Sequence, residues 1–245
     1  MFALTGLDWA LVLASALFVG LAKTAFNGVG LLTVIMMATV FPAKESTGIV
    51  LPVLVFGDLF AVLFYRRHGS PKTLLRLFPF AVAGVVAGFL FMDRIDNLQL
   101  RRIIGWLVLL MVAGSLFLKL RREGLNAQGV HFAAPTGIFA GFTTMIANAG
   151  GPVMTVYFEA MGVKKEEFVG NFAWFFAGIN LVKIPFSAML GLVTAESLRF
   201  DLRLFPVVLA GAVGGYFILK AVSQKAFDVI VLGLAAASAI HLIAV

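Results

Sequence analysis

Two short polar segments interrupt long apolar runs of this sequence, and their residue types suit the binding of an anion. Residues 27–30 read NGVG, and residues 148–151, 121 positions later, read NAGG. Asn and Gly form helices poorly, but each segment leads into a run that favours a helix. A helix that begins at such a break presents free N–H groups and the positive end of its dipole, and glycine lets a ligand approach the backbone. The pattern therefore predicts two helix starts aimed at one buried anion, although packing kinks between helices would leave the same pattern.

Polar and ionisable residues near the breaks extend this candidate site. Such residues are costly inside a membrane, so each one within an apolar run is a functional candidate. Lys183 lies inside a continuous run, and Asn180 shares its helix face three positions earlier, which makes Lys183 a better candidate than Lys23 for contact with the anion. Lys23 lies beside the first break, where it either contacts the anion or extends along the helix to the membrane surface. The candidate substrate-binding residues are Lys23, Thr24, Asn27, Gly28, Gly30, Thr144, Asn148, Gly150, Gly151, Asn180 and Lys183.

Asp58 lies in the middle of another apolar run, and two roles for it remain open. Either it carries a coupling proton, or it neutralises a nearby lysine such as Lys23. Asn171 precedes Asn180 by nine positions and projects roughly to the opposite side of the helix, which leaves one of the two to packing.

Catalysis is the weakest interpretation of these residues. The sequence has no cysteine, which removes thiolate metal sites and thiol nucleophiles, and its three histidines lie in or near loops or a terminus. It contains no HExxH, P-loop or serine-elbow pattern. The net charge of +7 does not indicate nucleic acid, because Lys and Arg lie mostly between the apolar runs. We therefore expect no enzyme, no metal, no cofactor and no nucleic-acid partner.

The elements that must position these residues are membrane helices. Hydrophobic residues make up 61% of the 245 residues, charged residues make up 13%, and the mean hydropathy is +1.03. A soluble domain of this length does not need so much apolar surface. The continuous apolar runs also exclude a β-barrel, because apolar and polar residues alternate along the strands of a barrel. The sequence therefore predicts an all-α, multi-pass integral membrane protein.

The apolar runs divide into ordinary spans and two longer regions. Residues 9–43 and 132–163 are too long for one span, which needs ~20 residues. Broken at its Asn-Gly tip, each region gives two arms of roughly 15–18 residues and forms a broken or re-entrant hairpin. Six ordinary spans are predicted at 46–65, 74–92, 102–119, 168–190, 203–220 and 226–244.

The two halves of the chain repeat one another, so each half is one broken hairpin followed by three transmembrane helices. The first repeat covers residues 1–122, the connecting loop covers 123–131, and the second repeat covers 132–245. Small-residue pairs in the repeat should face other helices, where backbones approach closely. Offsets of 121 and then 127 align Gly20 with Gly141, Gly84 with Gly211, and Gly88 with Gly215.

The charge distribution favours inverted repeats. If each broken region enters and leaves on one side, the halves are inverted, and the inside loops hold eleven Lys and Arg residues against six outside. If each region crosses once, the halves are parallel and the split is nine to eight. We therefore expect loops 66–76, 119–131 and 164–167 in the cytoplasm and both termini outside. Inverted repeats with interrupted helices are typical of secondary transporters, whose substrate binds near the midplane where the breaks meet.

Two segments, one opening each repeat, resemble a known family. They read VGLAKTAFNGVGLLTV in the first half and AGFTTMIANAGGPVMTVYF in the second, where ANAGGP precedes an apolar helix. The chain resembles the TauE/SafE family of bacterial membrane proteins, also called the sulfite exporter family. These two segments carry the resemblance most clearly, and it extends over nearly the whole chain. The resemblance implies the movement of sulfur-containing anions such as sulfite, sulfonates and thiosulfate, which agrees in sign with the helix starts.

We therefore expect a secondary transporter that moves sulfite, thiosulfate or an organosulfonate across the cytoplasmic membrane, with export coupled to an ion gradient. Two alternatives remain open, an uncoupled anion channel with the same site and a membrane scaffold that transports nothing. The expected partners are the small anion, the lipid bilayer and a coupling proton, and an oligomer is compatible with the sequence.

Overall fold

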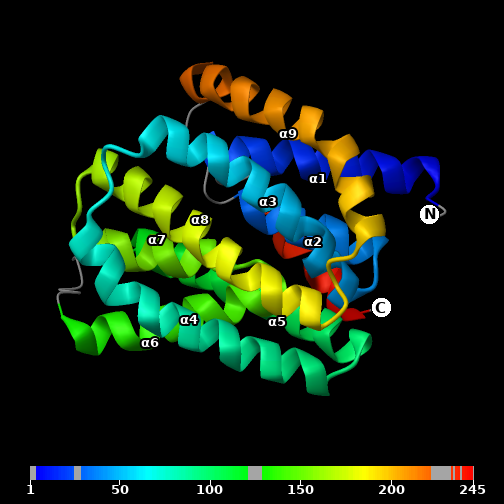
Figure 1. Ribbon diagram of the computed structural model, residues 1–245, viewed down its shortest axis with the longest axis horizontal. Helices are drawn as coiled ribbons and strands as arrows, with labels where there is room; N and C mark the ends of the chain where they lie inside the picture. Colours follow the sequence, from blue (N-terminus) through cyan, green and yellow to red (C-terminus); the bar gives the residue numbers. More distant parts are fainter. Residues whose placement is uncertain are drawn as a thin grey trace.

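The computed structural model describes residues 4–24, 29–120, 129–221, 233, 235–237 and 239–244. In this part of the chain the secondary structure is helical, with no strand (Figure 1). The helices are α1 (Gly6–Thr24), α2 (Gly30–Val40), α3 (Ala43–Tyr65), α4 (Pro71–Arg94), α5 (Asn97–Leu120), α6 (Val130–Ala147), α7 (Gly151–Ala160), α8 (Lys165–Met189) and α9 (Ala195–Ala221).

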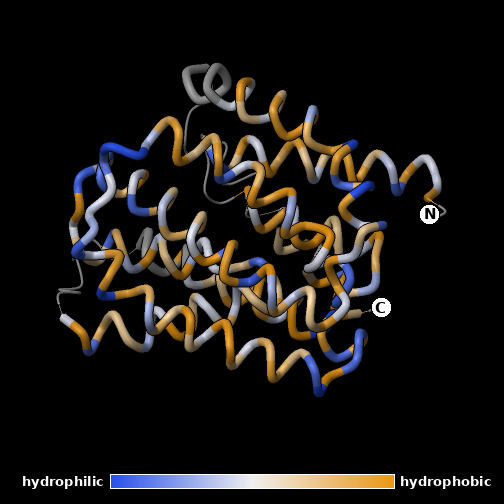
Figure 2. Tube along the Cα trace, in the orientation of Figure 1, coloured by the Kyte–Doolittle hydropathy of each residue, from blue (hydrophilic) through white to orange (hydrophobic). Residues whose placement is uncertain are grey.

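Helices α1, α3, α4, α5, α6 and α8 are long and apolar enough to cross a membrane. Hydrophilic residues gather mostly at the two ends of the molecule, and hydrophobic residues dominate the helices between them (Figure 2). Large apolar side chains such as Leu63, Trp106 and Leu181 are exposed on the outer surface, where lipid would cover them. The prediction of an all-α integral membrane protein is confirmed.

Five of the six ordinary spans predicted from the sequence correspond to one helix each, namely α3, α4, α5, α8 and α9. These helices begin three to eight residues earlier than predicted, because their first turns are polar and extend beyond the apolar run. For α4, Ser70 caps the start by accepting a hydrogen bond from the backbone N–H of Thr73, and Pro71 occupies the first turn. Of the span predicted at 226–244, residues 233, 235–237 and 239–244 are described and are helical, whereas most of the loop at 123–131 lies outside the described residues.

The two broken regions form helix pairs with unequal arms. α1 has 19 residues and α2 has 11, and α6 has 18 and α7 has 10. The prediction of two similar arms in each region is therefore wrong, since the first arm has the length of a span and the second reaches only ~16 Å. α2 ends because Phe41 is extended before Pro42, and α7 ends before Gly162, whose φ is 64°.

Two contacts between α1 and α9 show that these helices run in the same direction. The ring centroids of Trp9 and Phe200 lie 5.6 Å apart, and Gly20 packs against Val208 further along both helices, so α1 and α9 run in the same direction. α3 shares this direction, whereas α4, α6 and α8 run the opposite way (Figure 1). Helices at corresponding positions of the two halves, such as α1 and α6 or α3 and α8, therefore run in opposite directions.

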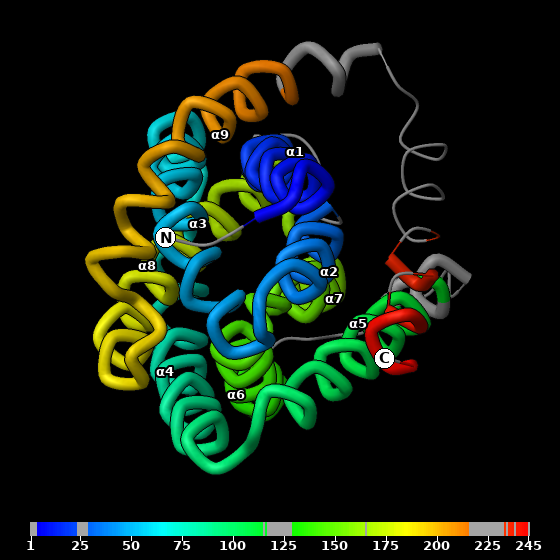
Figure 3. Tube along the Cα trace, turned by 90° about the vertical axis from the view of Figure 1, so that its right-hand side faces the viewer, coloured from blue at the N-terminus to red at the C-terminus, as the bar shows by residue number. Residues whose placement is uncertain are grey.

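The short helices α2 and α7 lie in the middle of the molecule. α2 packs back along α1, where Thr33 Oγ1 donates to the carbonyl oxygen of Ser15 at 3.3 Å. α7 packs back along α6, where the rings of Phe132 and Tyr157 stack with centroids 5.9 Å apart. From one end of the molecule α2 and α7 overlap (Figure 3), whereas from the side they lie apart along the long axis (Figure 1). The two short helices therefore extend from the middle of the molecule toward opposite ends.

Close glycine contacts join α1 to α9 and α4 to α6 at matching positions of the repeat. A Cβ on Gly20 would lie 2.1 Å from the carbonyl oxygen of Val208, and a Cβ on Gly141 would lie 1.9 Å from that of Ala81. The two pairs correspond in the repeat, because the offset of 121 aligns Gly20 with Gly141 and the offset of 127 aligns Ala81 with Val208. A Cβ on Gly84 would likewise lie 2.1 Å from a carbonyl oxygen of α6. The prediction that these glycines face other helices is confirmed, and the inverted relation of the repeats, with which the helix directions agree, stays a prediction.

Candidate functional site

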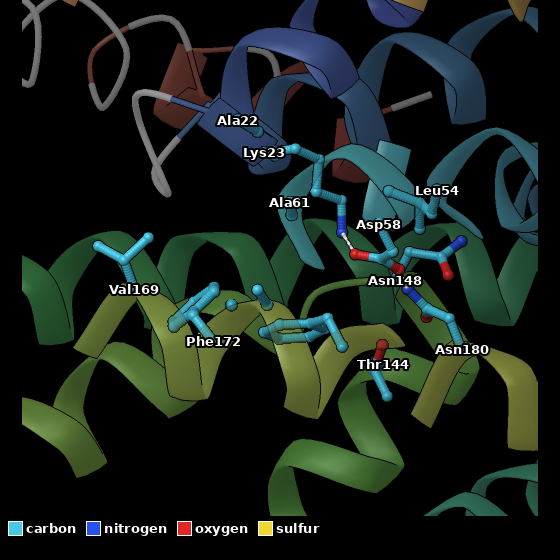
Figure 4. Close-up of a pocket in the computed structure, with 14 residues that line it drawn as sticks. Ala22, Lys23, Leu54, Asp58, Ala61, Thr144, Asn148, Val169, Phe172 and Asn180 are labelled. Carbon is cyan, nitrogen blue, oxygen red and sulfur yellow. Dashed lines mark hydrogen bonds and ion pairs between the residues drawn. The ribbon is translucent and has the colours of Figure 1, made fainter. Parts of the chain in front are cut away.

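A cavity lies where the two halves of the chain meet, beside the starts of α2 and α7. Its empty space measures about 650 Å³, a volume that includes open solvent. Its wall combines α1, α2 and α3 with the end of α6, the start of α7 and one face of α8 (Figure 4). The lining residues are Ala22, Lys23, Gly30, Leu54, Asp58, Ala61, Thr144, Asn148, Gly151, Val169, Phe172, Ala173, Phe176 and Asn180.

Lys23 and Asp58 form an ion pair in the cavity wall. The Lys23 ammonium donates to Oδ1 of Asp58, and Nδ2 of Asn180 donates to Oδ2 at 2.7 Å. The side chain of Asp58 is 2% exposed and that of Lys23 is 13% exposed, so the cation is the more accessible partner. Its ammonium also lies 5.4 Å from the ring centroid of Phe176. A buried carboxylate needs such partners, so the counter-ion role considered for Asp58 has a structural basis.

Lys183 lies behind the cavity wall. The residue is 1% exposed and does not line the cavity. Its ammonium donates to three oxygens, Oγ1 of Thr144 at 3.3 Å, Oδ1 of Asn148 at 2.5 Å and Oδ1 of Asn180 at 3.2 Å. An ammonium has three N–H donors, so these acceptors use all of them. Lys183 can therefore orient the polar side chains that line the cavity, and its charge acts on the site through them.

Asn148 ends α6 and directs its side chain into this polar cluster. Its φ of 52° and ψ of 26° are left-handed, a conformation that Asn tolerates better than most residues. Its backbone N–H bonds to the carbonyl oxygen of Thr144 at 3.0 Å, and its Nδ2 donates to the carbonyl oxygen of Thr47 at 3.0 Å. The NAGG break is therefore a helix end at which Asn takes the place that Gly often has, and the same side chain links α6 to α3.

The helices that follow the two breaks begin at the cavity without side-chain caps. Gly30 starts α2 and Gly151 starts α7, and both glycines line the cavity. Neither helix has a capping side chain or an acidic residue in its first turn. Their first N–H groups and positive dipole ends therefore add to the charge of Lys23. A Cβ on Gly30 would lie more than 4 Å from every other described residue that could block it, so the part of the chain that the structure describes leaves this helix start open to the cavity.

Most of the predicted site residues lie together in this structure. Gly150 does not line the cavity, because it packs inward, where a Cβ would lie 3.1 Å from the carbonyl oxygen of Ala140. Asn27, Gly28 and the side chain of Thr24 lie outside the described part of the chain. The predicted residues that line the cavity are Lys23, Gly30, Asp58, Thr144, Asn148, Gly151 and Asn180.

Asn171 lies away from this cluster. Its Oδ1 accepts a hydrogen bond of 2.6 Å from the backbone N–H of Ser70, in the loop between α3 and α4. Asn171 is therefore the asparagine that packs, as expected of one of the two, since it contacts a loop, whereas Asn180 contacts Asp58 at the cavity. Among the described residues, no group of three His, Asp or Glu side chains could hold a metal ion.

Sequence reasoning missed the apolar wall of the cavity, which is formed mainly by one face of α8. Its residues are spaced i, i+3, i+4 and i+7, and Asn180 continues the same face at i+11. Such a spacing is usual in helices that only pack, so it carried no signal by itself. The feature that could have identified this face is that it continues into Asn180, a polar candidate residue. The wall residues on α8 are Val169, Phe172, Ala173 and Phe176.

A family model described as Sulfite exporter TauE/SafE matches residues 12–242, nearly the whole chain. The matched range contains both breaks, both short helices and every residue that lines the cavity. No curated protein and no solved structure matches the chain.

Proposed function

Because the chain belongs to the TauE/SafE sulfite exporter family, we propose that it is a secondary transporter whose sulfur-containing anion binds in the cavity between its two halves. The family and the candidate spans make it a multi-pass protein of the cell membrane. One observation carries the proposal: two uncapped helix starts, at Gly30 and Gly151, meet the Lys23 ammonium in one cavity. Three sources of positive potential converge there, as an anion site requires.

Lys23 is the group that we propose to contact the anion directly. An anion that leaves water loses its hydration, and each helix start returns only ~0.3–2 kcal/mol. A full charge contributes more, because Coulomb energies rise as the dielectric constant falls. Lys23 lines the cavity and has one carboxylate partner, whereas the three N–H groups of Lys183 already have acceptors. Asn180 and Thr144 then serve as neutral hydrogen-bonding groups around the anion.

Asp58 is the residue that we propose to couple the anion to a proton. With no anion bound, its carboxylate is the counter-ion of Lys23. An incoming anion competes for the same ammonium, and two negative charges then lie close together. A proton on Asp58 removes that repulsion, so anion and proton each favour the binding of the other. The coupling would be one proton for each anion bound, because Asp58 carries one proton.

The glycine contacts support a specific movement for this transporter. They bind α1 of the first half to α9 of the second, and α6 of the second half to α4 of the first. These two pairs lie on opposite sides of α2 and α7 (Figure 3). We propose that each pair moves as one body in an inverted repeat, so that the cavity opens alternately toward the two sides of the membrane. Export is the direction that the family's description favours. Since anion and proton would cross together, export requires an outward anion gradient that exceeds the inward proton gradient.

An uncoupled anion channel is the second candidate, because the same cavity would also lower the barrier for a freely permeating anion. A scaffold without transport is the third. Flux that saturates with anion concentration and responds to a proton gradient distinguishes a transporter from a channel. Absence of anion binding would favour the scaffold.

The experiment begins with calorimetric titration of the purified chain with sulfite, thiosulfate, sulfoacetate and taurine. The protein is then reconstituted in liposomes, and flux of the tightest ligand is followed with and without an imposed proton gradient. We expect micromolar to millimolar binding of at least one sulfur anion, and flux that saturates and changes with the gradient. Flux that stays linear in concentration and ignores the gradient would leave the channel as the better description.

A further inference from the structure

Asp201 is a buried acid that no described residue neutralises. It lies in the second turn of α9, and the residue is 0% exposed. Neither of its carboxyl oxygens has a hydrogen-bond partner in the described part of the chain. The buried Asp58 and Lys183 differ from it, because the first pairs with Lys23 and the second donates to three oxygens. A buried polar group without partners is costly, so the presence of Asp201 needs a reason.

The internal repeat provides a comparison for this position. The offset of 127, which aligns Pro79 with Pro206, aligns Leu74 of α4 with Asp201 of α9. Leu74 is half-buried and packs against the main apolar core. The same position of the repeat therefore accepts a hydrocarbon side chain, and packing alone does not require an acid there.

Asp201 faces the junction of α9 with α1 and α3, the two helices that lie beside it (Figure 3). Phe205, four residues later, stacks on Phe56 of α3 with ring centroids 4.1 Å apart. Leu204 belongs to the buried apolar cluster that joins α9 to α1 and α3, and Gly211, on the same helix face as Leu204, packs on the α1 backbone. Since an α-helix turns ~100° per residue, Asp201 projects between the α3 side and the α1 side.

The turn of α3 that faces Asp201 contains a proline. α3 and α9 run in the same direction, so the turn before the stacked rings of Phe56 and Phe205 lies at the same level on both helices. That turn carries Pro52 on α3 and Asp201 on α9. Pro52 has no N–H, so the carbonyl oxygen of Gly48 lacks its usual helical donor. A protonated carboxyl group has an O–H that can donate to a carbonyl, whereas a carboxylate only accepts, so these surroundings suit the protonated acid.

The charged groups of the surrounding helices lie away from Asp201. Those on α9 are exposed, and α2 has none. On α1, one acid bonds to Thr5 and the lysine pairs with Asp58 at the cavity. On α3, the nearest ones lie in the first turn, ~10 Å before Pro52 along the helix. The titratable and charged side chains described on these helices are Asp8, Lys23, Lys44, Glu45, Asp58, Tyr65, Glu196, Arg199 and Arg203.

We propose that Asp201 is a proton-binding site at the junction of α9 with α3, separate from the anion cavity, which it does not line. In this conformation the carboxyl group holds a proton and the junction is closed. Release of the proton to water leaves a carboxylate among apolar residues, so it requires α9 to move away from α3 and admit water. A proton on Asp201 therefore holds the two helices together. The charge distribution predicts this end of α9 outside, so the site responds to the external pH.

Infrared spectroscopy of the purified protein at neutral pH tests the protonation state directly. A protonated carboxyl group has a C=O stretching band distinct from the bands of a carboxylate, and Asp201→Asn should remove one such band. Asp93→Asn is the matched control, because Asp93 is exposed at the end of α4, and it should leave the band in place. If wild type and Asp201→Asn show the same carboxylic-acid bands, Asp201 is ionised and the proposal is wrong.

The melting temperature provides a second test as pH is raised from about 5 to about 8. An unfolded chain releases this proton above about pH 4, whereas the folded chain keeps it, so the site makes the protein less stable as pH rises. The unfolding equilibrium should change by up to about tenfold per pH unit from this one proton. This contribution should disappear in Asp201→Asn and in Asp201→Leu, which copies the repeat, and remain in Asp93→Asn and Glu45→Gln. The same pH dependence in wild type and Asp201→Asn would overturn the proposal.

A cysteine at Leu204 measures opening of the junction. Leu204 is 1% exposed, and the chain has no other cysteine. Modification of Leu204→Cys by a small neutral thiol reagent should speed up with pH by up to about tenfold per unit more than in the Asp201→Asn background, where only the thiol titrates. Equal acceleration in both backgrounds would mean that the proton on Asp201 does not hold the junction closed.

Sodium distinguishes a proton site from a metal-cation site. Replacing potassium by sodium at constant pH and ionic strength should leave the melting temperature of the wild type unchanged. If sodium stabilises the wild type and not Asp201→Asn, the site holds a metal cation and the proton proposal fails. None of these measurements uses an anion, so the proposed transport function stands or falls separately.

Discussion

Nδ2 of Asn180 donates a hydrogen bond of 2.7 Å to Oδ2 of Asp58, and this bond joins the second half of the chain to the first at the cavity. Asn180 also accepts from Lys183, whereas Asp58 also accepts from Lys23. A continuous line of polar contacts therefore connects Lys23 and Lys183 through one amide and one carboxylate. Any movement that separates α3 from α8 must break this line, so the ligand state of the cavity and the contact between the halves depend on each other.

Lys23→Met should weaken anion binding at least tenfold, which corresponds to ~1.4 kcal/mol. The reason is that Lys23 is the cation that lines the cavity. The same change leaves the buried carboxylate of Asp58 without its cation, so the melting temperature should also fall. Calorimetric titration and thermal unfolding of the purified variant measure the two effects separately.

The double variant with Lys23→Met and Asp58→Asn is the control for this prediction. It removes both charges, so it should recover much of the lost thermal stability without recovering anion binding. Recovery of binding in the double variant would mean that Lys23 only neutralises Asp58 and does not hold the anion.

Asp58→Asn alone should abolish flux driven by a proton gradient and preserve exchange of anion for anion. The Asn side chain keeps the shape of the carboxylate and cannot carry a proton, while Lys23 loses its competitor and binds the anion at least as well. Exchange and gradient-driven flux are measured on the same liposomes. Normal gradient-driven flux in a well-folded variant would remove Asp58 from the coupling step.

Lys183→Met should also weaken anion binding at least tenfold, ~1.4 kcal/mol, although Lys183 does not line the cavity. Its ammonium fixes the side chains of Thr144, Asn148 and Asn180, and these lose their common donor in the variant. Lys183→Arg keeps the charge and changes the shape, so it should retain partial binding.

A purely structural role for Lys183 predicts a different result. In that case Lys183→Arg and Lys183→Met would lower the melting temperature by similar amounts. In both variants the loss of anion affinity would then be in proportion to the loss of stability. Titration at several ionic strengths adds a second readout, because loss of a charge near the anion should reduce the salt dependence of binding.

Topology is tested by single-cysteine labelling, which is clean because the chain has no cysteine. Lys164 and Asp96 are exposed in loops at opposite ends of the helices, the first before α8 and the second before α5. The excess of Lys and Arg predicts the loop of Lys164 in the cytoplasm, so an impermeant reagent on intact cells should label a cysteine at Asp96 and not one at Lys164. The reverse pattern would end the inverted arrangement with both termini outside.

The sequence predicted helix existence well and helix ends less well. Apolar runs and two Asn-Gly breaks were sufficient to predict broken hairpins, because a membrane span is set by length and hydropathy. The unequal arms were not predictable from hydropathy, since α2 and α7 are as apolar as a span and end at local features, an extended Phe41 before Pro42 and a left-handed Gly162.

The residue types of the candidate site could be predicted from the sequence. Which of these residues line the cavity and which lie behind its wall could not. Polar residues inside apolar runs drew attention to Lys23, Asp58, Asn180 and Lys183, which form one network in the structure. The sequence favoured Lys183 over Lys23 for contact with the anion, whereas Lys23 lines the cavity and Lys183 is buried behind its wall. Which lysine faces the cavity depends on how α1 and α8 pack, and the sequence of either helix alone does not show it. The apolar wall was missed for the same reason, because Phe172 has the spacing of an ordinary packing residue until its neighbours are known.

Gly30 gives the sharpest test of the helix starts. Among the described residues, none has an atom within 4 Å of a Cβ placed on Gly30, and the residue lines the cavity, so Gly30→Val should fold normally while its side chain occupies the space in front of the α2 N–H groups. We expect anion binding to fall at least tenfold, ~1.4 kcal/mol, with little change in melting temperature.

Gly141→Val is the contrasting variant, because its Cβ would lie 1.9 Å from the carbonyl oxygen of Ala81, so it should lower stability or prevent folding. Gly151→Val extends the test to the start of α7, which lines the same cavity. If Gly30→Val folds and binds the anion with unchanged affinity, the start of α2 does not contribute to the site, and the anion is held by Lys23 and α7 without it.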